Sequence, residues 1–126
     1  FIKLKYLDKH NSLRRGIAQY YYENIENNEI VLPYCSDWCD HVFHLFVIRS
    51  IQRNKLKEKL ENAGVQTLIH YPIPPYEQNA YKKWQKKCYP ITDIIYKEVL
   101  SLPMGPYLNI NSLFLITKII NNYTES

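Results

Sequence analysis

The apolar positions of this chain recur at helical spacing in its opening segment. Residues from about 2 to 27 contain no proline and a single glycine. Their larger apolar side chains fall roughly on one face of a helix, at Leu4, Leu7, Ile17, Tyr21 and Ile25. Because no helix-breaking residue interrupts the pattern, we predict one long opening helix over this segment.

A second helical pattern covers residues 52–65. Leu56, Leu60 and Ala63 form a single apolar stripe among lysines and glutamates. Gly64 follows the stripe, where a residue in the left-handed conformation commonly ends a helix. We therefore predict a helix that ends just before Gly64.

Three more helices are predicted towards the C-terminus. A short one is expected over residues 77–87, and another over residues 90–100, where a proline occupies the first position. The inward face of that second helix is predicted to consist of Ile91, Ile95 and Val99. Asn109 or Asn111 is suited to cap a last helix, which runs to about residue 122.

Four short segments have the composition of strands. Residues 41–50 form a continuous aromatic and β-branched run, which predicts a central buried strand. Shorter strands are expected over residues 30–33, 66–71 and 101–104. The chain therefore predicts an α/β protein of the α+β type, with a small, largely antiparallel sheet of three or four strands and helices packed on one face.

Length and charge narrow the class of protein. A chain of 126 residues with 46% hydrophobic content predicts one domain, and no apolar stretch is long enough to cross a bilayer. The formal net charge of +4 is small and spread over several helices, which argues against nucleic acid as a partner. Three cysteines, an odd number, favour a reducing compartment, so we expect a cytoplasmic protein with no membrane partner.

A metal site is the first candidate for chemistry. Cys35, Cys39, His41 and His44 are suitable zinc ligands that lie close together in the sequence. Structural zinc sites usually bring their ligands as two pairs a dozen or more residues apart, whereas the two histidines here enter a predicted strand on opposite faces. We therefore predict no metal, although a zinc-dependent protein stays open as a third hypothesis.

The loop after the 66–71 strand is the second candidate. The strand ends with His70 and Tyr71, prolines stiffen residues 72–75, and Tyr76 and Gln78 follow. Imidazole, phenol and amide groups on a rigid backbone suit sugar hydroxyls or phosphate oxygens. The alternative is that His70 and the tyrosines satisfy one another beneath a turn.

Three arginines complete the candidates. Arg49 ends the central strand, where it could meet a carboxylate of a ligand or form a surface ion pair. Arg14 and Arg15 lie in the opening helix and could contact a neighbouring domain, an anionic ligand or only solvent.

Four strings of the sequence, in order and in register, resemble one family: "LKYLDKHNSLRRGIAQYYYENI", "HVFHLFVIR", "LKEKLENAGVQTLIHYPIPPYEQNAY" and "YPITDIIYKEVLSLPMGPYL". The chain is similar over nearly its whole length to the C-terminal part of the DegT/DnrJ/EryC1/StrS aminotransferases. The resemblance implies the small C-terminal domain of a fold type I pyridoxal-phosphate (PLP) enzyme over residues 1–126. Residues 1–29 would form the connecting helix, and residues 30–126 the sheet and its helices.

The resemblance also implies an activity. These enzymes transfer an amino group from glutamate, through PLP, to a ketone of a nucleotide-linked sugar, here for lipopolysaccharide, O-antigen or another glycan precursor. The strings look most like enzymes that make 3-amino-3,6-dideoxyhexoses on thymidine diphosphate (dTDP). The family's Schiff-base lysine and cofactor site belong to a large N-terminal domain that these residues do not contain, so no catalytic residue is carried over and the chain alone is expected to be inactive.

The resemblance assigns this chain a wall of the substrate cleft. His70, Tyr71, Tyr76 and Gln78 would approach the nucleotide sugar, with Arg49 as a further candidate, and the complete protein would form a homodimer. Two departures from the family bear on the substrate: many relatives have histidine where Tyr76 stands, and the "YCSDWCD" loop has no recognised counterpart. The competing hypothesis is a stand-alone module that binds a nucleotide sugar, or a protein partner, without catalysis.

Overall fold

The computed structural model describes residues 2–84 and 89–124. The last part of the helix predicted over 77–87, and Cys88, lie outside these residues. Within them the regular elements are helices and two strands, as follows: a 3-10 turn Lys3–Tyr6, α1 Leu7–Asn24, β1 Phe46–Arg49, α2 Arg53–Asn62, 3-10 turns Pro75–Glu77 and Asn79–Trp84, α3 Pro90–Glu98, β2 Val99–Leu102 and α4 Ile110–Asn121.

The two strands form the centre of a small antiparallel sheet. Phe46 of β1 pairs with Leu102 of β2, and the ladder continues to Arg49 opposite Val99. Single antiparallel bridges add Val31 beside Arg49 and Leu68 beside Ser101. The order across the sheet is thus the segment at Val31, then β1, then β2, then the segment at Leu68. This arrangement confirms the predicted small antiparallel sheet, although each outer segment contributes only one bridge.

The strand boundaries differ from those predicted. Residues 41–45 do not join β1, because Phe43 has a φ of 45° and its N–H donates to His41 Nδ1 at 2.9 Å, which turns the backbone out of the extended conformation. At the other strand, β2 ends at Leu102, before Pro103, which has no N–H to donate to a ladder.

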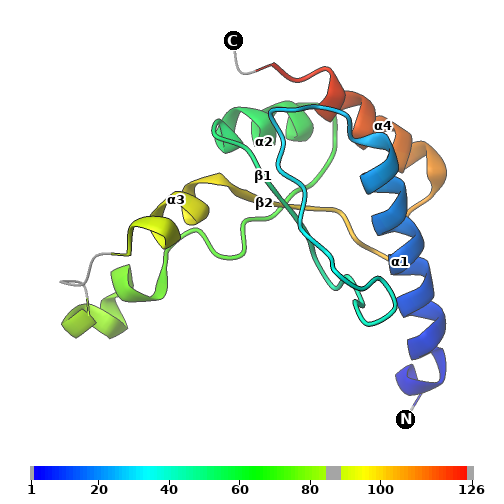
Figure 1. Cartoon of the computed structure of the whole chain (residues 1–126), viewed down its shortest axis with the longest axis horizontal. Coiled ribbons are helices and arrows are strands. Elements are labelled where there is room, and N and C mark those ends of the chain that lie inside the picture. The colour runs from blue at the N-terminus through cyan, green and yellow to red at the C-terminus, as the bar shows by residue number, and fades with distance from the viewer. Residues whose placement is uncertain (1, 85–88, 125–126) are drawn as a thin grey trace.

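Three helices and the sheet share one hydrophobic core. The core includes Phe46 and Ile48 of β1 and Leu100 and Leu102 of β2. The buried side chains that the helices add are Ile17, Ala18 and Tyr21 of α1, Leu56 and Leu60 of α2, and Leu113, Ile116 and Ile120 of α4. Because α1 and α4 run side by side (Figure 1), the first and last helices of the chain close this core together.

The C-terminal end of α2 and the N-terminal end of α4 lie at the residues that the sequence predicted. Gly64 has a φ of 79°, and Val65 N–H donates to Leu60 O at 2.9 Å, so the chain leaves α2 through a left-handed residue as expected. At α4, the Asn109 side chain accepts from Ser112 N–H at 2.9 Å, which makes Asn109 the cap.

The C-terminal ends of α1 and α4 are joined by asparagine side chains. Asn121 donates from Nδ2 to Asn24 O at 2.8 Å, and its Oδ1 accepts from Glu26 N–H at 3.0 Å. Asn27 donates to the carbonyls of Ile120 and Tyr123 at 2.7 and 2.8 Å. These bonds satisfy carbonyl groups that helix ends leave without partners and fix the two helices against each other.

Helix α3 belongs to an arm that extends away from the other helices, together with residues 72–84 (Figure 1). None of its residues is buried, and Ile91, predicted to face inward, is 74% exposed. That part of the prediction is wrong for Ile91. Although α3 contacts β1, the helix extends away from the core, and the side of it that carries Ile91 stays exposed. The arm is attached at its base, where Arg49 pairs with Glu98 and Ser50 N–H donates to Glu98 O.

We predict that Leu60→Ala lowers the free energy of unfolding by about 2–5 kcal/mol, because it removes a completely buried side chain and leaves a cavity. Urea unfolding measured by circular dichroism tests this. The control is Ile51→Ala at a position that is 77% exposed, for which a change within about 0.5 kcal/mol is expected. Equal losses in the two variants would contradict the assignment of the core.

Candidate functional site

A cleft of about 230 Å³ lies beside the sheet, where α1 approaches the segment that follows β2. Arg14 of α1, His44 and His70 contribute its polar wall, and Leu45, Leu68 and Leu102 part of its apolar wall. Residues 103–106 close one side. Side chains far apart in the sequence therefore meet at one place, which is a common property of ligand sites.

His70 is held in this cleft by β2. Its Nδ1 lies 2.9 Å from the Oγ of Ser101, a residue that is only 4% exposed. Ser101 also exchanges both backbone hydrogen bonds with Leu68, at 2.8 and 3.3 Å. One buried residue of the sheet thus positions both the segment that carries His70 and the imidazole itself, and Nε2 is the ring nitrogen left for a ligand.

Tyr71 lies beside His70 and faces outward. The two rings meet edge to face with their centroids 5.8 Å apart, and the Tyr71 residue is 67% exposed. The peptide bond between His70 and Tyr71 is cis. Tyr71 does not line the cleft itself, so its phenol can reach only a ligand that extends out of it.

Tyr76 and Gln78 lie farther along the arm and have partners there. The Tyr76 hydroxyl donates a hydrogen bond to Asp93 Oδ1, and its ring lies against Tyr89 with the centroids 4.8 Å apart. Gln78 donates from Nε2 to Ile73 O at 3.3 Å. Neither side chain lines the cleft that contains His70.

Arg49 forms the ion pair that was one of its two predicted roles. Its Nη2 lies 2.6 Å and its Nε 3.0 Å from Glu98 Oε2. The structure therefore separates the predicted site residues: His70 lies in the cleft, Tyr71 beside it, and the other three contact groups of this chain.

Sequence reasoning did not place Arg14 and His44 in this site. One signal for Arg14 was available, because residues 14, 17, 18 and 21 follow helical spacing and the last three are buried. An arginine on the inward stripe of a helix is uncommon and needs a partner. For His44 the predicted strand gave the wrong environment, since the residue precedes β1.

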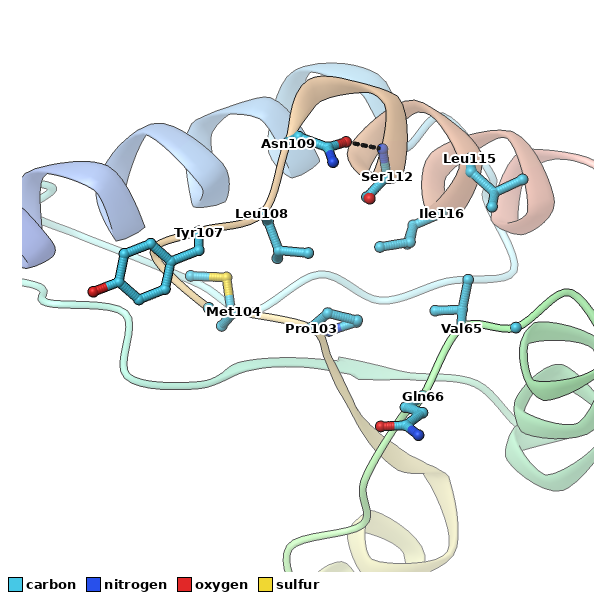
Figure 2. Close-up of a pocket in the computed structure, with 12 residues that line it drawn as sticks. Val65, Gln66, Pro103, Met104, Tyr107, Leu108, Asn109, Ser112, Leu115 and Ile116 are labelled. Atoms are coloured by element: carbon cyan, nitrogen blue, oxygen red, sulfur yellow. Dashed lines mark hydrogen bonds between the residues drawn. The ribbon is translucent and has the colours of Figure 1, made fainter.

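Two larger hollows in the described part of the chain have a different character. Figure 2 shows one of about 580 Å³ between α4 and the segments around Val65 and Met104, and no charged residue lines it. Its polar groups include Asn109 and Ser112, which bond to each other at the start of α4. Another, of about 740 Å³, contains Arg15 together with Glu23, so its charges oppose each other. Of these three hollows, only the cleft beside His70 contains an arginine without a carboxylate.

Residues 2–84 and 89–124 also bear on the zinc hypothesis and on membrane insertion. No group of three or more histidine, cysteine or acidic side chains there is arranged to hold a metal ion. Cys35 and Cys39 are both free thiols. No helix in the same residues is both long and apolar enough to cross a membrane.

The Tyr76–Asp93 hydrogen bond generates a prediction about ionisation. This bond, followed by desolvation and nearby negative charge, raises the pKa of Tyr76 to about 12. The neutral phenol is favoured by folding, so this contribution to stability is present below pH 10 and is lost as the pH rises towards 12. Asp93→Ala should lower the pKa of Tyr76 towards 10, measured by NMR of ring-labelled tyrosine. Glu77→Gln is the control, because that carboxylate is a lesser cause; an equal fall in both variants would contradict the assignment.

Comparison with known proteins identifies the family. Residues 1–121 match the DegT/DnrJ/EryC1/StrS aminotransferase family. The chain is similar to a dTDP-3-amino-3,6-dideoxy-alpha-D-galactopyranose transaminase of Aneurinibacillus thermoaerophilus, with 45% identity over 97% of this chain and 34% of that protein. It is also 34% identical, over 85% of this chain and 29% of the other, to a dTDP-3-amino-3,4,6-trideoxy-alpha-D-glucose transaminase of Streptomyces venezuelae.

Solved structures share the fold. The S. venezuelae protein DesV in complex with a ketimine intermediate superposes with a TM-score of 0.91 and 30% identity, over 99% of this chain and 34% of that one. NtdA of Bacillus subtilis, with the cofactor PMP bound, gives a TM-score of 0.76 and 30% identity, over 90% of this chain and 30% of that one. This chain spans about a third of the length of these relatives. The match over residues 1–121 and the shared fold show that the chain belongs to the DegT/DnrJ/EryC1/StrS aminotransferase family.

Proposed function

We propose that this chain is part of a PLP-dependent aminotransferase that moves an amino group from glutamate to a keto group of a nucleotide-linked deoxysugar. The observation that carries the proposal is the 45% identity, over 97% of the chain, to a transaminase of a dTDP-linked amino sugar. Relatives named for UDP-linked sugars match at 31% identity, which favours dTDP as the carrier.

The described residues do not fit the anchoring site of the cofactor. PLP enzymes hold their cofactor as a Schiff base on a lysine, and such a lysine needs a desolvated environment. None of the lysine side chains described here is buried, and none lines the cleft beside His70. The chain alone is therefore expected to be inactive, and the cofactor would be held by another part of the complete protein.

The contribution of this chain is then to bind and orient the sugar. Ser101 fixes the His70 ring through Nδ1, which leaves Nε2 to hydrogen-bond a sugar hydroxyl, and the fixed ring loses little further conformational freedom on binding. Tyr71, exposed beside it, can contact the part of the nucleotide sugar that extends outward. The remaining predicted residues would act indirectly, by holding the arm in place; these are Tyr76, Gln78 and Arg49.

The same proposal extends to the location, the assembly and the pathway of the complete protein. The complete protein would be a cytoplasmic homodimer that makes an amino sugar for lipopolysaccharide, O-antigen or another glycan. Support for a larger assembly comes from the arm, since Ile91 and Ile94 of α3 are exposed apolar side chains without a covering element in the described chain. The second candidate is a binding module without catalysis, for which the cleft lined by Arg14, His44 and His70 would be the ligand site.

The proposal predicts turnover by the complete gene product. When that protein is supplied with PLP, glutamate and a dTDP-linked 3-keto-6-deoxyhexose, 2-oxoglutarate and the amino sugar should form in equal amounts, measured by mass spectrometry. The isolated 126-residue chain should give no product. Binding of the sugar nucleotide by the complete protein, with no transfer from any amino donor, would instead support the binding module.

We predict that His70→Ala raises the KM for the sugar by on the order of tenfold, because one hydrogen bond to the substrate is lost. The visible absorbance of the bound cofactor should stay unchanged, since this residue does not hold it. Tyr71→Phe should have a smaller effect of the same kind. Tyr34→Phe is its control, because Tyr34 is 91% exposed in a separate loop. A loss of cofactor absorbance in His70→Ala would contradict this division of roles.

A further inference from the structure

The cleft beside His70 contains a cation that the proposed function does not use. Arg14 projects from the middle of α1, and its Nε is buried without a hydrogen-bond partner in the described part of the chain. The other two arginines near the sheet differ in this respect. Arg49 pairs with Glu98, and Arg53 donates to Val99 O at 3.1 Å and to Asn54 Oδ1 at 2.7 Å.

A buried guanidinium N–H without a partner is unfavourable, because it has lost its hydration and gained no hydrogen bond. Burial of this kind is tolerated where a partner arrives from outside, such as a ligand. Arg14 therefore has the unmet hydrogen-bonding capacity that is expected of a binding residue in the absence of what it binds.

The charges around Arg14 specify the kind of partner. His44 and His70 line the same cleft, and no aspartate or glutamate is among its lining residues. The guanidinium of Arg14 creates a positive potential, which no acidic side chain of the lining offsets. The geometry of a guanidinium matches the paired oxygens of a phosphate or a carboxylate.

The size of the cleft agrees with such an anion. A volume of about 230 Å³ is several times the roughly 30 Å³ that a water molecule occupies in the liquid. It is too small for a whole nucleotide sugar, since drug-sized ligands occupy pockets of about 300–1,000 Å³. One anionic group of a larger substrate therefore suits it better than the entire molecule.

We propose that Arg14 binds an anionic oxygen group of a substrate, either a phosphate of the nucleotide or a carboxylate of the amino donor, in the cleft that it shares with His44 and His70. The assignment of the anion to a substrate rests on the proposed function. Arg14 is thus a substrate-binding residue on α1, and the opening helix takes part directly in the site.

The test uses the complete protein and calorimetry with two probes that undergo no reaction. The first probe is dTDP, which carries the phosphates without the sugar, and the second is glutarate, a dicarboxylate without an amino group. Arg14→Gln removes the charge but retains polar groups. Arg14→Lys retains the charge but loses the paired donors.

Arg15 provides a matched control. It is the next residue of the same helix, has the same side chain, and lines the separate hollow that contains Glu23. Arg14→Gln should weaken the binding of one probe by on the order of tenfold, which is the usual effect of losing a charge-assisted hydrogen bond. Arg14→Lys should give a smaller loss, and Arg15→Gln should leave both affinities within about twofold.

Weaker binding of dTDP identifies the anion as a phosphate, and weaker binding of glutarate identifies it as a carboxylate. Both results support the proposal. Unchanged affinity for both probes in Arg14→Gln overturns it, and so does an equal loss in Arg15→Gln. If Arg14→Gln lowers the thermal midpoint of unfolding, Arg14→Lys becomes the deciding variant. An Arg14→Lys protein that has an unchanged midpoint and binds both probes with unchanged affinity also overturns the proposal.

The result is separable from the proposed function, because calorimetry requires no turnover. A protein that binds a probe through Arg14 but transfers no amino group contradicts the aminotransferase and leaves the anion site standing. If the Arg14→Gln variant transfers the amino group at the normal rate and binds both probes with unchanged affinity, only the proposed anion site is contradicted.

Discussion

The pairing of Ser101 with the strand segments on both sides of it fixes the geometry of the candidate site. On one side Ser101 lies opposite Val47 of β1, and on the other it exchanges two backbone hydrogen bonds with Leu68. Because hydrogen bonding fixes the register of a strand pair, this residue determines where the chain leaves the sheet after Leu68. The side chain of Ser101 then holds His70, so the same residue sets both the backbone and the imidazole of the site.

The packing of the helices supplies the opposite wall. The Tyr21 hydroxyl donates to Pro103 O at 2.9 Å, and its ring is completely buried against Phe46. This contact brings α1 to the segment that follows β2, and Arg14 lies two helical turns before Tyr21 on the same side. The core therefore does more than stabilise the domain, since it places Arg14 of α1 in the same cleft as His70, which follows the segment paired with β2.

Much of this fold follows from local features of the sequence. The stripe before Gly64, the cap at Asn109 and the apolar run at Phe46–Arg49 each reflect short-range physics, and the structure has all three. Two features were not predicted. Phe43 leaves the extended conformation through a hydrogen bond from its N–H to His41 Nδ1, which the apolar character of the run does not reveal. Ile91 is exposed although its spacing predicts burial, because the burial of a helix face depends on distant contacts.

The site shows the same distinction. His70 could be anticipated, because a strand that ends at a proline-stiffened loop presents its last side chains to a ligand. Arg14 could not be assigned to the same site, since its meeting with His70 requires the tertiary contact between α1 and the segment after β2. Resemblance indicated the family, but only the assembled cleft brings Arg14, His44 and His70 together.

The central claim is that this cleft receives part of the substrate, and a crystal structure of the complete protein with its nucleotide sugar tests it most directly. The account predicts sugar oxygens within hydrogen-bonding distance of His70 Nε2 and an anionic group of the substrate at the guanidinium of Arg14. A substrate bound elsewhere, with Arg14 paired instead to an acidic side chain of the protein, would contradict it.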